Sequence, residues 1–299
     1  MSNHFEEKLQ RRIYFSRHDA CLLQVKVFWP FKFILNNFRL KGKVTIITGV
    51  ASGIGEATAM LFAEHGAFIV MADTRDDLGN QVVATIGLNK ASYRHCDVRD
   101  EKQVAETMAY VIEKYGSLDI IYSNAAVLGR PMDNILDMNI EDFDYTMAAN
   151  LRASALVIKH GARAMVARNI AGSIICNGSI ASSKGGSGPP AYTISKHGLL
   201  GLVRSASSEL GRYGIRVNCI SPFGVATSLA LNEHSLDPNR LQSLGSSLAS
   251  LKGVKLQPKH VAEAALFLAS DESTHISGHN LVVDGGTSVV SNIMSIITD

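Results

Sequence analysis

The chain alternates short runs of apolar, often β-branched residues with longer stretches in which apolar residues recur every three or four positions. The short runs are typical of strands buried on both faces, and the longer stretches are typical of amphipathic helices. Seven strands are predicted at residues 43–48, 68–73, 92–96, 118–123, 172–177, 215–220 and 280–283. Helices are predicted at residues 55–65, 100–115, 140–168, 192–213 and 258–269.

This alternation places a helix between nearly all successive strands. Right-handed crossovers then build a parallel sheet that is covered on both faces. The predicted fold class is therefore α/β, a single doubly wound (Rossmann) domain with a seven-stranded parallel sheet. Ligands of such sheets bind beyond the carboxyl ends of the strands.

One segment, residues 226–253, breaks this rhythm between the sixth strand and the last helix and is rich in Ser and Leu. We predict that it forms a small helical substrate lid; the alternative is that its leucines only close the core. These leucines are Leu229, Leu231, Leu241, Leu244, Leu248 and Leu251.

Length and composition are consistent with one large domain. The 299 residues, 46% hydrophobic and 19% charged, predict a domain over residues 41–299 after an N-terminal extension of residues 1–40. A formal net charge of +2 gives no electrostatic case for nucleic acid or an anionic membrane as partner. Four widely spaced cysteines show no metal-site or disulfide pattern, so we expect no metal and a reduced intracellular compartment.

The extension is basic and contains an aromatic patch at residues 28–33 that is too short to span a bilayer. Its acidic residues and few serines fit poorly with a transit peptide. We therefore expect a dispensable extension and a cytoplasmic protein. A plastid location is the alternative, if the extension is a transit peptide.

A glycine turn follows the first predicted strand and opens the first predicted helix. In such a turn Gly49 permits the sharp bend, Gly53 lets backbone N–H groups approach a pyrophosphate, and Gly55 allows close packing of helix and strand. A nucleotide-hydrolase phosphate loop would instead need Gly-Lys-Ser/Thr, but Glu56 follows Gly55. The turn therefore predicts a dinucleotide site.

Asp73 ends the second predicted strand, where an acidic residue accepts hydrogen bonds from the adenosine ribose hydroxyls. Its charge would repel a 2′-phosphate, which favours NAD over NADP. Arg75 leaves NADP open, because a guanidinium two residues away could neutralise that phosphate. The alternative for Arg75, which we prefer, is a solvated surface charge.

Tyr192 and Lys196 are four residues apart and share one face of a predicted helix. A nearby ammonium group stabilises a phenolate, so Lys196 is expected to lower the pKa of Tyr192 toward the range of efficient proton transfer. Tyr110 and Lys114 have the same spacing, but no suitably placed serine precedes them. We interpret the second pair as a surface feature without chemistry.

Taken together, these motifs resemble those of the short-chain dehydrogenase/reductase family over residues 40–287. The matching positions are the Thr-Gly-x-x-x-Gly-x-Gly turn at 48–55, Asn124, Asn150, Ser179 thirteen residues before Tyr192, Lys196, and Val-Asp-Gly-Gly at 283–286. The resemblance implies an NAD-dependent alcohol dehydrogenase. An NADP-dependent ketone reductase of this family, or a cofactor-binding scaffold without catalysis, remains an alternative.

The resemblance also implies the roles of individual residues. Tyr192 would be the general acid/base, Ser179 would hydrogen-bond the reacting oxygen, Lys196 would also bind the nicotinamide ribose, and Asn150 would hold a water of the proton relay. The implied cofactor-binding residues are Gly49, Ser52, Gly53, Ile54, Gly55, Asp73, Asp97, Val98, Asn124, Tyr192, Lys196, Pro222, Val225 and Thr227.

Segments 186–193, 216–227 and 277–286 resemble, more narrowly, a plant secoisolariciresinol-dehydrogenase-like group. This resemblance implies oxidation of a hydrophobic secondary alcohol, a terpenoid such as a borneol-type monoterpenol or a lignan, and a homotetramer. Three positions depart from the family pattern: Ala126 and Phe223 replace glycines, and Ile180 replaces a common serine. The Ala126 methyl group would lie near the cofactor.

Overall fold

The structure, a computed structural model, describes residues 38–129, 134–225, 243 and 245–289. One parallel sheet runs through these residues in the strand order β3-β2-β1-β4-β5-β6-β7. Its strands are β1 Val44–Thr48, β2 Phe68–Asp73, β3 Ala91–His95, β4 Ile120–Ser123, β5 Ser173–Asn177, β6 Arg216–Pro222 and β7 Asn280–Val283. The predicted seven-stranded α/β fold is confirmed.

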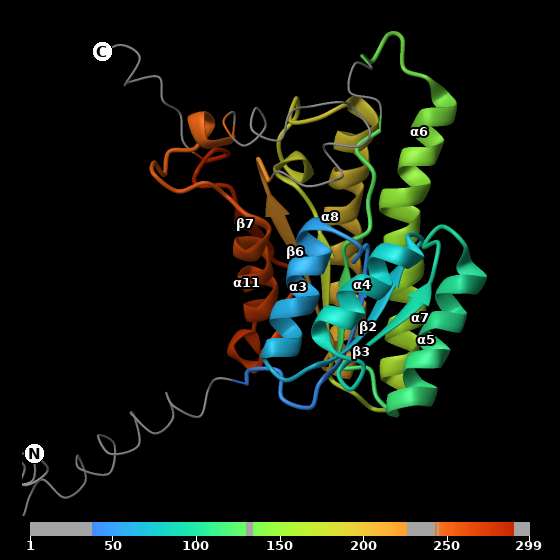
Figure 1. Ribbon diagram of the computed structural model, residues 1–299. Helices are drawn as coiled ribbons and strands as arrows, with labels where there is room; N and C mark the ends of the chain where they lie inside the picture. Colours follow the sequence, from blue (N-terminus) through green and yellow to red (C-terminus); the bar gives the residue numbers. More distant parts are fainter. Residues whose placement is uncertain (1–37, 130–133, 226–242, 244, 290–299) are drawn as a thin grey trace, which may run out of the picture. The chain divides into compact units, whose positions relative to one another are not determined.

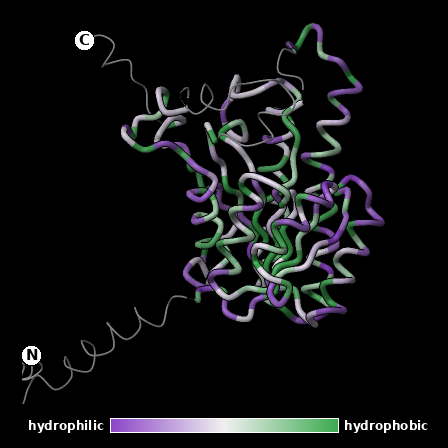
Figure 2. The backbone as a smooth tube through the Cα atoms, viewed as in Figure 1, coloured by the Kyte–Doolittle hydropathy of each residue, from purple (hydrophilic) through white to green (hydrophobic). Residues whose placement is uncertain are grey.

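Helices cover both faces of the sheet (Figure 1). Alternate strand residues point to opposite faces, so that Ile46 and Val70 pack on one side while Ile47 and Met71 pack on the other. One core lies against α5, α7 and α8, and the second lies against α3, α4 and α11. The strands at the centre of the sheet are the most hydrophobic part of the backbone in Figure 2. The helices are α3 Gly53–Glu64, α4 Asp76–Ile86, α5 Glu101–Tyr115, α6 Ile140–Met147, α7 Ala153–Ala167, α8 Pro190–Leu210 and α11 Pro258–Ala269.

Helix α4 was not predicted from the sequence. Only three of its residues are buried, and it contains Gly79, a poor helix former. A Cβ atom at Gly79 would lie 2.1 Å from the ring of Tyr93 on β3. Close packing of α4 on the edge strand therefore requires glycine at position 79, and this glycine is one reason why the helix was not predicted.

The predicted helix 140–168 is present, but a π-helical segment, Ala148–Arg152, separates α6 from α7. Asn150 lies in this segment, and its side chain is buried. The Val127 N–H donates to Asn150 Oδ1 at 2.8 Å, and Asn150 Nδ2 donates to the Val127 carbonyl at 2.9 Å. A π-segment widens the helical turn locally, and such segments often occur at functional sites.

The start of the sheet domain lies slightly before the predicted boundary. Leu40 is fully buried in the core with α3 and α11, and its N–H donates to the His65 carbonyl at 3.0 Å. Arg39 forms an ion pair with Glu272. Both residues were assigned to the extension, whose residues 1–37 lie outside the described part.

Most of the predicted lid, residues 226–242 and 244, also lies outside the described residues. In the described part, residues 245–248 are helical, and the Leu251 N–H donates to the Gly285 carbonyl at 2.9 Å. Leu248 and Leu251 are 46% and 59% exposed, so these two leucines do not close the core. None of the described helices is long and apolar enough to cross a bilayer.

Candidate active site

The glycine turn between β1 and α3 has the geometry that its sequence predicts. Gly49 and Gly53 have φ angles of 68° and 66°, a region that favours glycine. A Cβ at Gly49 would lie 2.7 Å from the backbone of Ala125, and one at Gly55 would lie 2.1 Å from the Gly49 carbonyl oxygen. The turn therefore brings bare backbone to the carboxyl edge of the sheet, at the N-terminus of α3.

Asn124 ties this turn to the end of β4. Its Nδ2 donates to the carbonyls of Thr48 at 3.0 Å and Gly49 at 2.9 Å, and its own N–H donates to Thr48 Oγ1 at 3.0 Å. Asn177, at the end of β5, donates to Asn124 Oδ1 at 2.9 Å. Asn177 was not singled out from the sequence, although it ends a strand that leads into the predicted site.

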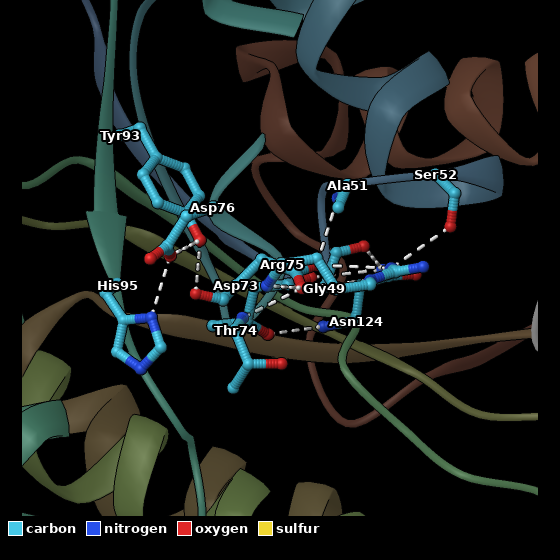
Figure 3. Close-up of polar contacts among 11 residues, drawn as sticks. Gly49, Ala51, Ser52, Asp73, Thr74, Arg75, Asp76, Tyr93, His95 and Asn124 are labelled. Atoms are coloured by element: carbon cyan, nitrogen blue, oxygen red, sulfur yellow. Dashed lines mark hydrogen bonds and ion pairs between the residues drawn. The ribbon is translucent and has the colours of Figure 1, made fainter. Parts of the chain in front are cut away.

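Asp73 lies beside the turn at the end of β2, and its carboxylate is buried and closely surrounded (Figure 3). Oδ2 accepts from the Ala51 N–H at 3.0 Å, and Oδ1 accepts from the Thr74 N–H at 2.8 Å. The Arg75 side chain donates to both carboxylate oxygens, through Nε at 3.2 Å and Nη2 at 3.4 Å. Arg75 Nη2 also donates to Ser52 Oγ at 3.1 Å. Arg75 is therefore an ion-pair partner of Asp73 and not the solvated charge that we preferred.

A second polar group supports the backbone after Asp73 (Figure 3). The Tyr93 hydroxyl lies 2.6 Å from the Asp73 carbonyl oxygen and 2.8 Å from Asp76 Oδ1. His95 Nδ1 lies 2.7 Å from the same Asp76 oxygen. The hydrogen bonds from His95 and Tyr93 hold the pKa of Asp76 below its usual value. Asp76 therefore stays ionised and fastens β3 to the start of α4.

A cavity of about 640 Å³ opens along this edge of the sheet. It extends from Asp73 and the glycine turn to Ser179 and Tyr192. Most of the residues predicted to bind cofactor or substrate line it, namely Gly49, Ser52, Ile54, Asp73, Asp97, Val98, Asn124, Ser179, Tyr192, Lys196, Pro222 and Val225. Gly53, Gly55 and Asn150 are not part of this lining, and Thr227 lies outside the described residues.

Ser179 is positioned by a short helical turn that begins immediately after it. The Ala181 N–H donates to Ser179 Oγ at 3.2 Å, and the Ser179 N–H donates to Ser182 Oγ at 3.2 Å. Ile180, one of the departures from the family pattern, is buried in this turn. The turn fixes the Ser179 hydroxyl, which acts to lower the pKa of the Tyr192 phenol.

Tyr192 and Lys196 lie one turn apart on α8, and both are buried. Lys196 Nζ donates to the Asn177 carbonyl at 2.8 Å and lies 5.5 Å from the centre of the Tyr192 ring. Asn150 reaches the same helix, because its Nδ2 donates to Ser195 Oγ at 3.0 Å. The sequence-predicted polar groups therefore converge from the π-segment, β5 and α8.

The proton affinities of the pair differ from the sequence expectation. Burial raises the pKa of the Tyr192 phenol, and the hydrogen bond with Ser179 opposes this rise. Burial lowers the pKa of Lys196 to about 8. The expected lowering of the tyrosine pKa by the lysine is therefore not found in this site, where loss of solvation is the largest effect on the phenol.

The arrangement fits a nicotinamide dinucleotide. The glycine turn is a cradle that side chains would fill, and the N-terminus of α3 favours a pyrophosphate. Asn177 lines the cavity, and its buried Oδ1 has no hydrogen-bond partner among the described residues. This oxygen is therefore an unsatisfied acceptor at the cavity wall. In the described part of the chain, no three His, Cys, Asp or Glu side chains gather as a metal site requires.

Comparisons with known proteins agree with this geometry. A family model described as enoyl-(acyl carrier protein) reductase matches residues 49–288. Short-chain dehydrogenase reductase 3b of Arabidopsis thaliana is 55% identical over 252 residues, which cover 84% of this chain and 98% of that protein. Secoisolariciresinol dehydrogenase of Forsythia intermedia is 43% identical over 259 residues, 86% of this chain and 93% of that protein.

A solved structure gives the same result. The crystal structure of a short-chain type dehydrogenase/reductase from Mycobacterium marinum superimposes with a TM-score of 0.76 at 29% identity, covering 86% of this chain and all of that one. The family binds NAD or NADP. These matches show that the chain is an oxidoreductase that belongs to the short-chain dehydrogenase/reductase family.

Proposed function

We propose that this protein is an NAD-dependent dehydrogenase that oxidises a hydrophobic secondary alcohol to a ketone, with Tyr192 as general acid/base. The substrate class we infer is a terpenoid alcohol, such as a borneol-type monoterpenol, or a lignan. The observation that carries the proposal is that Ser179, Tyr192 and Lys196 line the same cavity as the glycine turn and Asp73. One cavity thus offers a dinucleotide cradle and a proton-transfer group.

Coenzyme binding would involve the following residues. Gly49, Ser52 and Ile54 hold the pyrophosphate against the N-terminus of α3, and Asn124 keeps the turn in place. Lys196 binds the nicotinamide ribose. A bound nicotinamide supplies a hydride acceptor for the carbinol carbon of the substrate.

Proton transfer would take place at the Tyr192 oxygen. Ser179 donates a hydrogen bond that orients the substrate oxygen, and Tyr192 accepts the hydroxyl proton during oxidation. Both Tyr192 and Lys196 are buried, one helical turn apart, and in the proposed relay the phenol passes its own proton toward Lys196 as it accepts the substrate proton. Tyr192 can accept the substrate proton only after Lys196 has lost a proton. Because the pKa of Lys196 is about 8, this loss occurs in mildly alkaline solution. Asn150 would hold a relay water next to Ser195 and Lys196.

The substrate class is supported by the walls of the cavity. Part of the cavity wall is apolar, and a few polar groups in an apolar pocket suit a hydrophobic alcohol. The residues in question are Ala126, Val127, Leu128, Pro189 and Phe223. Gly245, from the described end of the lid segment, also lines the cavity. The relative from Forsythia, a secoisolariciresinol dehydrogenase by name, is consistent with such a substrate.

The test is a coupled search for substrate and coenzyme. The protein is mixed with NAD or NADP and a panel of cyclic monoterpenols, lignans and small polar alcohols, and reduced coenzyme is followed by absorbance. We expect turnover with NAD and hydrophobic secondary alcohols. Binding of NAD without turnover of any alcohol would favour a scaffold, and turnover only of ketones with NADPH would favour the reductase alternative.

The preference for NAD depends on Asp73, whose carboxylate is engaged by Arg75. For Asp73 to accept the ribose hydroxyls, the half-exposed Arg75 side chain must turn away from it. Arg75→Met is therefore expected to lower KM for NAD and raise KM for NADP, since it frees the carboxylate and removes the cation that contacts it. Asp73→Ala should relax the preference. A wild-type enzyme that already prefers NADP would contradict the proposal for Asp73.

We also infer a homotetramer and a cytoplasmic location. On α8, Ile194 is 40% exposed although apolar, which fits a helix that pairs with a second copy. Light scattering on the purified protein tests the assembly. A fluorescent fusion of the full chain, compared with a fusion that lacks residues 1–37, distinguishes the cytoplasm from a plastid.

A further inference from the structure

The second Tyr-x-x-x-Lys pair, Tyr110 and Lys114 on α5, forms a polar cluster beside the edge strand β3. Lys114 Nζ donates to the Tyr110 hydroxyl at 3.1 Å. The guanidinium carbon of Arg94, on β3, lies 4.8 Å from the centre of the Tyr110 ring. Ser92 Oγ lies 3.4 Å from the Tyr115 hydroxyl. None of these residues lines the coenzyme cavity.

The groups around Tyr110 favour its anion. Partial burial alone would raise the pKa of the phenol, but the hydrogen bonds with Ser92 and Lys114 and the charges of Lys114 and Arg94 outweigh it and lower the pKa below its usual value. The same contact raises the pKa of Lys114, although burial acts against it. The ammonium therefore stays charged where it stabilises a phenolate.

Nearby carboxylates do not cancel this positive field. On α5 itself, Glu106 pairs with Lys102 at 3.8 Å, and Glu113 lies with His160 and Arg168 along the groove between α5 and α7. Among residues 38–129, 134–225, 243 and 245–289, no ion pair engages Arg94 or Lys114. The buried Nε of Arg94 has no hydrogen-bond partner in the same part of the chain.

We propose that Tyr110 is a nucleophilic phenol and a covalent modification site for electrophiles that transfer a sulfonyl or acyl group. With an aryl sulfonyl fluoride, the Tyr110 oxygen forms a bond to sulfur and the sulfur–fluorine bond breaks. Fluoride leaves with the electron pair, and the phenol proton goes to solvent. Lys114 remains an ammonium throughout and holds the attacking oxygen.

The chain contains a matched comparison for this site. Tyr213 is 42% exposed, and the guanidinium carbon of Arg212 lies 4.9 Å from its ring centre. Like Tyr110, Tyr213 therefore has an arginine over its ring, and it is at least as accessible as Tyr110. Among the described residues, however, no cation donates a hydrogen bond to the Tyr213 hydroxyl. A difference in reactivity between the two tyrosines then reports the effect of Lys114.

The experiment is time-resolved labelling of the full-length protein with an aryl sulfonyl fluoride at pH 8, followed by peptide mass spectrometry. In the wild type we expect Tyr110 to label severalfold faster than Tyr213, because Lys114 and Arg94 favour the Tyr110 anion. Equal rates at the two tyrosines would overturn the proposal. This comparison needs no variant, so it does not depend on the folding of one.

Two variants sharpen the result. Lys114→Met keeps the apolar stem but loses the donor, so it should slow labelling of Tyr110 severalfold and leave Tyr213 unchanged. Lys114→Arg retains a cationic donor and should restore much of the rate. Unchanged labelling of Tyr110 in Lys114→Met would contradict the proposed role of the lysine; circular dichroism checks that the variants are folded.

Discussion

The same four-residue spacing of Tyr and Lys occurs twice in this molecule, in two environments. On α8, Tyr192 and Lys196 are buried at the coenzyme cavity, and the lysine Nζ contacts a backbone carbonyl instead of the phenol. On α5, Tyr110 is half-buried and its hydroxyl accepts directly from Lys114. Burial raises the pKa of Tyr192, whereas its neighbours lower that of Tyr110.

This difference teaches that the spacing alone does not determine the proton chemistry. Near water, an ammonium beside a phenol stabilises the phenolate. In the buried pair, loss of solvation disfavours both charges, so the phenol keeps its proton and the lysine more readily loses one. A phenol that is protonated at rest, one helical turn from a lysine whose pKa is about 8, suits the proposed transfer of protons in either direction.

Replacing the two phenols separately should give the largest contrast. Tyr192→Phe removes the proposed proton-transfer group and should lower kcat about a thousandfold while coenzyme binding is retained, within the range for loss of a general acid/base. Tyr110→Phe should change kcat by less than about twofold, because Tyr110 lies outside the cavity. Steady-state kinetics and coenzyme titration measure both; a large loss in Tyr110→Phe would break the comparison.

The pH dependence of oxidation should be the next largest effect. Oxidation needs a pair that has lost a proton, so the single-turnover rate should rise up to about tenfold per pH unit below the Lys196 pKa, about 8, and level off above it. Ketone reduction should show the opposite slope. Lys114→Met serves as the control and should leave both profiles unchanged. A rate of oxidation that is flat between pH 6 and 9 would contradict coupled titration of the buried pair.

The smallest expected effects concern stability. The pKa of Lys196 is lowered from its ordinary value near 10.5 to about 8, so the unfolded chain binds more protons between these values and stability rises with pH in that window. At pH 7 the shift costs up to about 3 kcal/mol, partly offset by the hydrogen bond to Asn177, about 1 kcal/mol. Lys196→Met should therefore be as stable as the wild type or more so at pH 7.

The Tyr110–Lys114 pair on α5 provides the control for the predicted stability of Lys196→Met. The pKa of Lys114 is raised, so its contribution is present below the ordinary lysine pKa and is lost only as pH rises through the folded value. Lys114→Met should thus lose roughly 0.5 kcal/mol at pH 7, as for an exposed charge interaction. Urea denaturation at pH 7 and pH 10 measures both variants. If Lys196→Met strongly destabilises the protein at pH 7, burial of the charged Lys196 side chain does not lower the stability of the wild type.

The sequence predicted the elements whose boundaries coincide with a change of pattern. Strands β2 and β7 and helix α11 match their predicted residues, because clear apolar runs end at polar or turn residues. Helix α4 was missed, since it buries few residues and contains Gly79. The π-segment at Asn150 could not be predicted, because the apolar period continues through it.

At the candidate site, the sequence indicated which residues would meet but not their environment. The contact of Arg75 with Ser52 depends on how the glycine turn folds back on the end of β2, 23 residues away in sequence. The pKa directions of the two Tyr–Lys pairs likewise depend on burial by residues remote in the chain. These are tertiary effects that local spacing cannot encode.

The most direct test is a titration of the individual phenols by NMR in coenzyme-free protein labelled with ¹³Cζ-tyrosine, with Tyr110→Phe and Tyr192→Phe used to assign the two signals. We predict that Tyr110 ionises at a lower pH than Tyr192, and that Tyr192 remains a phenol beyond the ordinary tyrosine pKa of about 10. If Tyr192 ionises first, burial does not govern this pair, and the account of its chemistry is wrong.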